Sequence, residues 1–549
     1  MRLLQALTVA AITAQCQALG DVVNLGYAKY KGVTNKTTGI TKFSALRYAA
    51  APVGDLRWRE PVPIETVLTK GNGQPLNATV RGPVCHNTNP GWAIELTESL
   101  PTQAVATPDP SIVYSEDCLL LDVVAPAKPN SKKLPVIIQI HGGGYVSGNS
   151  ESPDGSVFVQ QSKGNIVWVQ IQYRLGPYGF LAGSEVQADG TANAGLLDQR
   201  LALEWVKNHI AAFGGDPDQI TIWGGSAGGG SVVNQMILHG GQSNPPFAAA
   251  IAEYPWTQTY HDAPTIEAQY NELLDVAGCD NLACLRALPS DQLVNASQTV
   301  YLTAWANKNY GFGDFYFTPS VDGKVVQGLP SEEIKAGHFS KVPFLTNRAP
   351  HEGILFSQMT MKEESEIQPD LEKYWGVTNE TFYQTLLDLY PASDFTSPPT
   401  GAPHAIVSLT EQGNLTSVFF RRAAIIGDYS IVCPTNDYAT ALSAQGVPVY
   451  KMAFNAGTQL HASTLAYLFA ADSVSGNPTL SAQMKEWFIS FIMHRDPNAY
   501  ATISKAAWPL YGSEKQVLNV DEYSLSTISD PDANERCAFL NANAHLLKH

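Results

Sequence analysis

The chain has 549 residues, of which 44% are hydrophobic and 15% are charged, and its formal net charge at pH 7 is −16. This balance is that of a globular protein and excludes a disordered chain. The strong negative charge disfavours nucleic acid and anionic membrane surfaces as partners.

The first residues carry the pattern of a secretory signal peptide. Arg2 precedes a short apolar run, and Cys16-Gln17-Ala18 offers a cleavage site. We therefore expect residues 1–18 to be a signal and the mature protein to be secreted. An amphipathic N-terminal helix is the alternative interpretation. No later segment is apolar over enough residues to span a bilayer, so we expect no integral membrane segment.

The cysteines and sequons also favour secretion. Without Cys16 the chain keeps an even set of six cysteines, which allow 15 pairings that sequence alone does not distinguish. A metal site is the competing interpretation, but no C-x-x-C pair or histidine cluster supports it, so we expect no metal. Five Asn-x-Ser/Thr sequons are candidate glycosylation sites; they are Asn35, Asn77, Asn295, Asn379 and Asn414.

From residue 134 onward the hydrophobic pattern alternates between strands and helices. The pattern predicts, in chain order, strands at 135–140 and 165–173, a helix at 193–210, a strand at 220–223, a helix after Ser226, strands at 342–347 and 447–454, and a helix at 481–494. Such alternation predicts an α/β fold with a large, mostly parallel sheet covered by helices on both faces. No linker-like break separates these elements, so we expect residues 19–549 to form one domain.

A glycine-rich stretch between a predicted strand and a predicted helix contains Ser226. Gly224-Gly225-Ser226-Ala227-Gly228 matches G-x-S-x-G in the strand–turn–helix context of a nucleophile elbow. A turn this sharp holds the serine in a strained conformation that exposes its hydroxyl group. The flanking glycines leave room where the strand and the helix approach each other. An ordinary glycine-rich turn is the alternative.

A second glycine-rich motif, "HGGGY" at His141–Tyr145, follows the predicted strand 135–140. In hydrolases with a nucleophile elbow, such a loop supplies backbone amides to an oxyanion hole, together with the amide of the residue after the nucleophile. A flexible turn or a phosphate-binding loop is the alternative, but the GK[ST] ending of a P-loop is missing.

A nucleophilic serine needs a base and an acid that orients it, and on this fold the chain order is Ser, Asp/Glu, His. Glu352 follows the predicted strand 342–347 and His461 follows the strand 447–454, so both occupy the expected strand ends. The position at a strand end favours these two over their rivals. The rivals are Asp322, which has the sequence context of a hairpin turn, and the histidines His404, His494, His545 and His549.

Motifs spread over nearly all of the chain resemble one family. They are "YAAAPVGDLRWREP", "SEDCLLLDVVAP", "HGGGYVSG", "NAGLLDQRLALEWVKNHIAAFGGDP", "WGGSAGGGSV", "NRAPHEGILF" and "HASTLAYLF". The chain resembles the type B carboxylesterase/lipase family, the cholinesterase-like branch of the alpha/beta hydrolases, and especially its secreted fungal members. The likeness implies an alpha/beta-hydrolase fold and a Ser226–Glu352–His461 triad. It also implies oxyanion amides from Gly143, Gly144 and Ala227, and no cofactor.

The resemblance further implies the disulfides Cys85–Cys118 and Cys279–Cys284, which leave Cys433–Cys537 as the third pair. Two positions depart from the family pattern. Many relatives carry glutamate where this chain has Gly225, and the acid motif is usually Asp-Glu-Gly where this chain has His351-Glu352-Gly353. Both departures put in doubt a cholinesterase-like preference for cationic substrates.

The segment from Cys85 to Cys118 corresponds to a loop that covers the active-site mouth in this family. Trp92, Leu96 and Leu100 fall at four-residue spacing, which predicts either a short amphipathic lid that contacts a lipid interface or residues that simply pack the loop down. Downstream of the elbow helix, Tyr254 and Trp256 are candidate walls of an acyl pocket or plain core residues.

The expected function is hydrolysis of small carboxylic esters through an acyl-enzyme, on short- to medium-chain or aromatic esters and on lipids. Two alternatives use the same fold. One is a non-catalytic, cholinesterase-like binding or adhesion protein, and the other is amide hydrolysis or related chemistry by the same triad. Retention of every predicted catalytic residue favours the esterase. Oligomeric state and the natural ester are not encoded in these motifs.

Overall fold

The computed structural model describes residues 20–68, 73–99, 111–151, 153–471 and 476–549. The predicted signal peptide, residues 1–18, lies outside this part. Eleven strands form one sheet in the order β14-β13-β12-β11-β10-β9-β7-β8-β6-β4-β3. Their bounds, in chain order, are β3 Val33–Asn35, β4 Ile40–Arg47, β6 Leu120–Pro126, β7 Leu134–Ile140, β8 Val167–Ile171, β9 Gly215–Gly225, β10 Ala249–Glu253, β11 Phe344–Arg348, β12 Val449–Asn455, β13 Gln516–Asp521 and β14 Leu525–Ser529.

The centre of the sheet is parallel, from β8 through β7, β9, β10, β11 and β12 to β13. Strands β8, β10 and β11 are buried at every residue, as expected for parallel strands covered on both faces. This confirms the predicted α/β sheet. Its two margins are antiparallel, because β3, β4 and β6 pair in sequence with β8 on one side and β14 pairs with β13 on the other.

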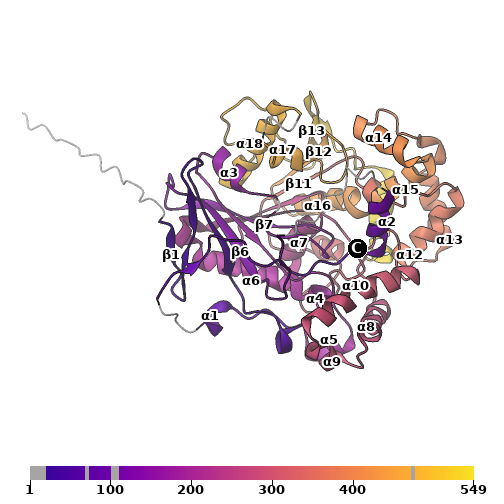
Figure 1. Ribbon diagram of the computed structural model, residues 1–549. Coiled ribbons are helices and arrows are strands. Elements are labelled where there is room, and N and C mark those ends of the chain that lie inside the picture. Colours follow the sequence, from indigo (N-terminus) through magenta and orange to yellow (C-terminus); the bar gives the residue numbers. More distant parts are fainter. Residues whose placement is uncertain (1–19, 69–72, 100–110, 152, 472–475) are drawn as a thin grey trace, which may run out of the picture.

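Helices cover both faces of the sheet (Figure 1). The helices α6 (Ala194–His209) and α7 (Ala227–Ile237) pack on one face, and α3 (Ser156–Gln161) and α18 (Pro478–His494) pack together on the other. Side chains alternate between two hydrophobic cores. Ile138 of β7 joins the core beneath α6 and α7, whereas its neighbour Ile137 joins the core beneath α3 and α18.

Further elements surround this framework. A small second sheet joins β1 (Val22–Asn24), β2 (Lys29–Lys31) and β5 (Leu76–Asn77). The remaining helices are α1 Ile64–Val67, α2 Gly91–Ser99, α4 Gly176–Phe180, α5 Ser184–Asp189, α8 Ala263–Ala277, α9 Leu282–Ala287, α10 Ser290–Ala306, α11 Pro330–Ala336, α12 Ile367–Trp375, α13 Glu380–Leu389, α14 His404–Gly413, α15 Ser417–Gly427, α16 Cys433–Ala444, α17 Leu465–Leu468, α19 Glu535–Ala542 and α20 Ala544–Leu547.

Three disulfide bonds are present, so the expectation of disulfides is confirmed. They join Cys85 to Cys118, Cys279 to Cys284 and Cys433 to Cys537, across 33, 5 and 104 residues of chain. Within the described ranges, no helix combines the length and the hydropathy needed to cross a membrane.

Candidate active site

Ser226 lies at a turn with no connecting loop. It follows Gly225, the last residue of β9, and precedes Ala227, the first residue of α7. Its φ of 59° and ψ of −128° place a non-glycine residue in a strained backbone region. The turn is held by its own main chain, because the Ser226 amide donates to the Glu253 carbonyl at 3.2 Å and the Ser226 carbonyl accepts from Gly230 and Trp256 at 2.9 Å.

The glycines around Ser226 are required by close backbone contacts. A Cβ atom on Gly224 would lie 2.2 Å from the carbonyl oxygen of Gly228, and a Cβ atom on Gly228 would lie 2.2 Å from the carbonyl oxygen of Ile140. The start of α7 therefore packs directly on both β9 and the end of β7. Any larger residue at either position would push the strand and helix apart.

The HGGG loop lies against this turn. A Cβ atom on Gly142 would lie 2.6 Å from the carbonyl oxygen of Gly225, so the loop and the elbow are in contact. Gly143 and Gly144 have φ values of +107° and +63°, which favour glycine. His141 stacks on Tyr173, whose hydroxyl donates to the His141 carbonyl, and burial lowers the pKa of His141 to about 4. A neutral His141 thus supports the start of the loop.

Glu352 and His461 form a hydrogen-bonded pair. The distance from His461 Nδ1 to Glu352 Oε2 is 2.6 Å, and Glu352 Oε1 accepts from the Ala349 amide at 2.6 Å. Glu352 is 1% exposed. Because a carboxylate only accepts, the hydrogen of the neutral imidazole belongs on Nδ1 and leaves Nε2 free to accept a proton.

The two loops that carry these residues are joined through their backbones. His351 pairs with Leu460 in a parallel β-bridge, and the His351 amide donates to the Gln459 carbonyl. Next to Glu352, a Cβ atom on Gly353 would lie 1.9 Å from the Ala423 carbonyl oxygen, so α15 packs directly on the acid loop. Burial lowers the pKa of His351, and the nearby Arg348 lowers it further.

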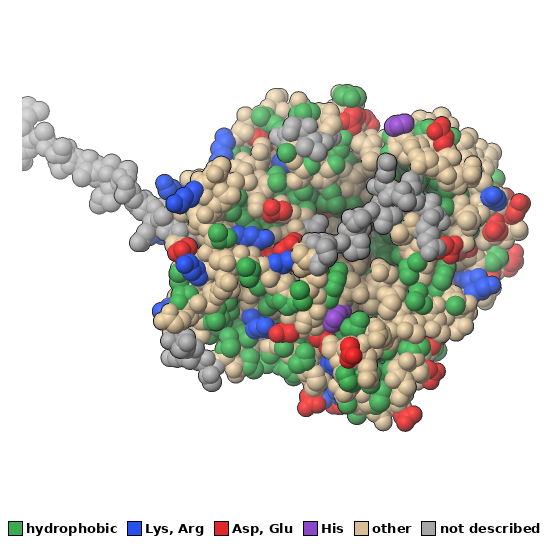
Figure 2. All heavy atoms as spheres, in the orientation of Figure 1, with side chains coloured by type: hydrophobic (Ala, Val, Ile, Leu, Met, Phe, Trp, Pro, Cys, Tyr) green, Lys and Arg blue, Asp and Glu red, His purple; other side chains and the backbone are tan. Residues whose placement is uncertain are grey.

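Ser226 and His461 line the same cavity, which has a volume of about 520 Å³. Figure 2 shows the molecule hollowed beside α2, with hydrophobic side chains in the hollow. The lining includes the predicted loop glycines Gly143 and Gly144. Its apolar walls come from widely separated parts of the chain: Trp92 and Leu96 of α2, Phe315, Leu355, Phe356, Leu465 and Phe469.

The helix α2, in the Cys85–Cys118 loop, is anchored at its first turn. The Trp92 indole donates to the Asp314 carbonyl at 2.5 Å and its ring packs against Phe315 and Phe356. Trp92 and Leu96 therefore form a wall of the cavity, while Leu100 lies outside the described residues. Of the two candidate aromatic residues after β10, Tyr254 lines the cavity. Trp256 does not line it but packs against the wall residue Phe356, with 4.4 Å between the two ring centroids.

The rival residues lie away from this cavity. Asp322 accepts hydrogen bonds from the amides of Lys324, Val325 and Val326, as a turn aspartate does. The four rival histidines lie at helix ends or at the C-terminus: His404 begins α14, His494 ends α18, His545 pairs with Glu332, and His549 packs on Tyr429.

Phe315 and Glu253 line the cavity but were not identified from the sequence as site residues. Phe315 lies over the HGGG loop, since a Cβ atom on Gly144 would lie 2.0 Å from its ring. Glu253 is 1% exposed, and burial raises its pKa to about 7. The one sequence signal for Glu253 is its position at the carboxyl end of a parallel strand, where ligand-binding sites of α/β sheets occur.

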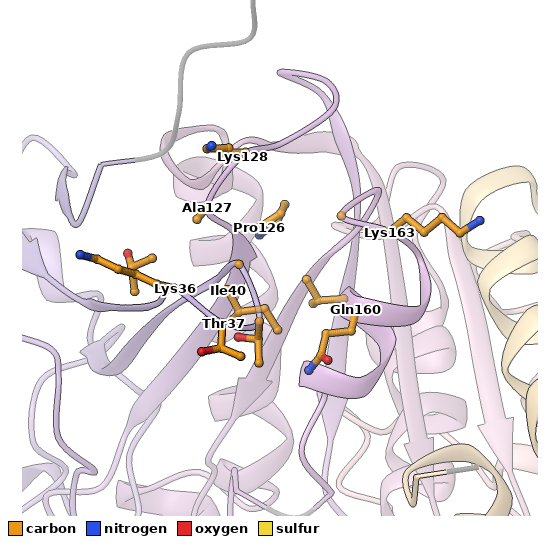
Figure 3. Close-up of a pocket in the computed structure, with 13 residues that line it drawn as sticks. Lys36, Thr37, Ile40, Pro126, Ala127, Lys128, Gln160 and Lys163 are labelled. Atoms are coloured by element: carbon orange, nitrogen blue, oxygen red, sulfur yellow. The ribbon is translucent and has the colours of Figure 1, made fainter. Parts of the chain in front are cut away.

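A larger cavity, of about 690 Å³, lies far from Ser226 in the fold, at the β3–β4 hairpin (Figure 3). Its lining includes Ile40, Pro126 and Val159, and three lysines. The side chains of Lys36 and Lys163 extend away from each other, so they do not converge on one ligand group. The cavity that contains Ser226 is therefore the candidate active site.

A doubly covered parallel sheet with a serine elbow and a His–Glu pair at its strand ends defines the α/β-hydrolase class. The carboxylesterase family model matches residues 20–540, and the chain therefore belongs to the carboxylesterase family, an enzyme family of carboxylic ester hydrolases. Lipase 1 of Geotrichum candidum is 33% identical over 88% of each chain. Secreted lipase 1 of Botryotinia fuckeliana is 32% identical over 92% of this chain and 90% of its own. Among solved structures, Aspergillus niger EstA superposes with a TM-score of 0.80 at 28% identity, covering 96% of this chain and 99% of that one.

Proposed function

We propose that the protein is a secreted serine carboxylesterase that hydrolyses neutral esters through an acyl-enzyme formed on Ser226. The observation that carries this proposal is the 2.6 Å hydrogen bond between His461 and Glu352, with His461 and Ser226 lining one cavity. The glycine-rich loop at Gly143 and Gly144 lines the same cavity. A serine, a base with its orienting acid, and backbone amides are the parts that acyl transfer needs.

In the first half-reaction, Ser226 Oγ forms a bond to the ester carbonyl carbon while its proton moves to His461 Nε2. The negative charge that develops on the carbonyl oxygen is stabilised by the amides of Gly143, Gly144 and Ala227. Ala227 is suited to this because its amide is one of the unpaired N–H groups at the start of α7. The tetrahedral intermediate then collapses. The bond between its carbon and the alkoxy oxygen breaks, this oxygen takes the proton from His461, and the alcohol leaves.

In the second half-reaction, water attacks the acyl carbon and gives its proton to His461. The bond to Ser226 Oγ breaks, the oxygen regains the proton, and the carboxylic acid leaves. Glu352 accepts a hydrogen bond from Nδ1 throughout and stabilises the imidazolium that forms twice in each cycle.

The walls of the cavity favour neutral esters with short- to medium-chain or aromatic acyl groups. Among the described residues that line it there is no lysine or arginine, and Glu253 is the one carboxyl group. An anionic substrate would find no cationic partner there, and the Glu253 carboxyl group already accepts three hydrogen bonds. Aromatic rings at Trp92, Phe315 and Phe356 offer apolar contact instead.

Secretion, glycosylation and the domain boundary belong to the same proposal. The six cysteines of the described residues are all in disulfides, which suits an oxidising compartment. All five sequon asparagines (Asn35, Asn77, Asn295, Asn379 and Asn414) are exposed, as an acceptor for a glycan must be. We infer that residues 19–549 form the mature domain after removal of residues 1–18.

The test is hydrolysis of nitrophenyl acetate, butyrate, octanoate and palmitate by the full chain and by Ser226→Ala. We expect the highest kcat/KM on the shorter esters, and a loss of about four orders of magnitude or more in the variant. A fluorophosphonate probe should label the native protein at residue 226 and leave the folded variant unlabelled. Turnover that survives in Ser226→Ala, or a probe attached to another residue, would refute the assignment of the nucleophile.

A further inference from the structure

Glu253, the last residue of β10, is a buried carboxyl group that acyl transfer does not use. It accepts three side-chain hydrogen bonds. Trp223 Nε1 donates to Oε2 at 2.6 Å, while Asn347 Nδ2 and Thr464 Oγ1 donate to Oε1 at 3.1 and 2.9 Å. All three partners are neutral side chains, and all three are buried.

Each of the three donors belongs to a different segment of the proposed triad. Trp223, on β9, lies three residues before Ser226; Asn347, on β11, lies five residues before Glu352; and Thr464 lies three residues after His461. These segments are far apart in sequence and meet at one carboxyl group. The main chain of Glu253 makes a fourth hydrogen bond, because its carbonyl accepts from the Ser226 amide.

We propose that Glu253 is a positioning residue that fixes the nucleophile, acid and base segments relative to one another. This inference rests on the proposed function, since it concerns the geometry of that triad. A carboxyl group suits the task because its two oxygens accept several hydrogen bonds in one plane, which an aliphatic side chain at this position could not do. The strand that carries it lies between β9 and β11, so the group is already placed between two of the three segments.

The chemistry of the three partners predicts which substitutions the site tolerates. Asn347 Oδ1 has no hydrogen-bond partner in the described structure. The side-chain amide of Asn347 can therefore rotate by about 180° and accept a hydrogen bond from a new donor. The Thr464 hydroxyl can rotate to accept as well. Glu253→Gln can therefore keep the three segments joined, whereas Glu253→Leu leaves three buried donors without an acceptor.

The test compares matched pairs of variants in the full chain. Thr464→Val keeps the shape of the side chain and removes the link to the His461 segment, and Thr464→Ser keeps the hydroxyl. We expect Thr464→Val to lower kcat on nitrophenyl butyrate about tenfold or more with KM within threefold, and Thr464→Ser to stay within threefold. Glu253→Leu should lose at least a hundredfold in kcat, and Glu253→Gln less than tenfold.

Glu486→Gln is the control for a merely structural role. Glu486 is a buried carboxyl group on α18 that accepts hydrogen bonds from the amides of Thr502 and Ile503 and does not line the cavity. The Glu486→Gln substitution should lower the melting temperature of the protein without lowering kcat. Unchanged kcat in Thr464→Val, equal impairment in Thr464→Ser, or an equal loss in Glu486→Gln would overturn the inference.

The nucleophile variant separates this inference from the function on which it rests. If Ser226→Ala abolishes turnover and Thr464→Val does not reduce it, only the positioning role of Glu253 fails. If Ser226→Ala retains turnover, the proposed triad itself fails, whatever the other variants do.

Discussion

Replacing Gly144 with alanine is expected to disable the oxyanion loop while leaving the fold intact. The added Cβ atom would lie 2.0 Å from Cε1 of Phe315, where carbon atoms normally approach to about 3.5–4.0 Å. The Phe315 ring cannot easily turn aside, because its edge-to-face contacts with Trp92 and Trp256 place ring centroids 5.2 and 5.5 Å away. The loop itself must therefore move by about 1.5 Å or more.

Such a shift takes the Gly144 amide out of reach of the developing oxyanion. Loss of one such donor costs about 2.7–4 kcal/mol of transition-state stabilisation, which corresponds to a decrease in kcat of about 10²–10³. The assay is kcat and KM for nitrophenyl butyrate, with folding followed by circular dichroism. We expect the loss in kcat and little change in the melting temperature.

Two further variants isolate the cause. Gly39→Ala is the matched control, because Gly39 has a similar φ of +68° but nothing within 4 Å of the added Cβ atom. It should show only the cost of a left-handed alanine, about 1 kcal/mol of stability, and full activity. Combining Gly144→Ala with Phe315→Ala removes the clash and should restore at least tenfold of the lost kcat. A Gly144→Ala enzyme within tenfold of the native rate, or no recovery in the double variant, would refute the reasoning.

Two predictions concern stability. Removing the Cys433–Cys537 disulfide, which closes a loop of 104 residues, should cost about 5 kcal/mol of unfolding free energy. Removing the Cys279–Cys284 disulfide, which closes a loop of 5 residues, should cost about 2 kcal/mol. Denaturant midpoints check this order, and the reverse order would contradict it. Because burial raises the pKa of Glu253 from 4.5 to about 7, the folded protein holds a proton that the unfolded chain releases. That contribution to stability, up to about 3 kcal/mol, is complete below pH 4.5 and disappears as the pH rises through 7. The free energy of unfolding of Glu253→Gln should therefore depend less on pH between 5 and 8 than that of the native protein. Equal slopes of this free energy against pH in the two proteins would exclude the raised pKa.

Long apolar patterns made the central elements predictable. The helix expected at 193–210 is α6 at Ala194–His209, and the strand expected at 342–347 is β11 at Phe344–Arg348. A parallel strand buried on both faces is a continuous apolar run, and a covering helix has an apolar stripe, so each carries a strong local signal.

The strands at the margins of the sheet were missed, even though β6 is buried along its whole length. We made no strand prediction before residue 134, yet β4 and β6 lie there, and β13 and β14 follow the last predicted helix. Strand β14 is partly exposed along its whole length, so its apolar content does not separate it from a loop.

The candidate site divides in the same way. Ser226, Glu352 and His461 follow strand ends in the order that the fold dictates, so position in the chain was enough to propose them. The wall residue Phe315 comes from a loop and Phe356 from a 3-10 helix at Ile354–Phe356, and their proximity depends on tertiary packing. Their aromatic character alone is as typical of a core as of a pocket. Glu253 gives no sequence signal besides its position at a strand end, because its proposed role depends on three partners that only folding brings together.

The space beside Gly225 is limited by Tyr254. A Cβ atom on Gly225 would lie 2.5 Å from the Tyr254 hydroxyl oxygen, and Tyr254 is 3% exposed, with its ring edge-on to His461 at 5.0 Å. A side chain at position 225 would therefore displace the Tyr254 phenol from its packing beside His461. Residues 225 and 254 are thus energetically coupled, and a larger side chain at one position requires a smaller one at the other.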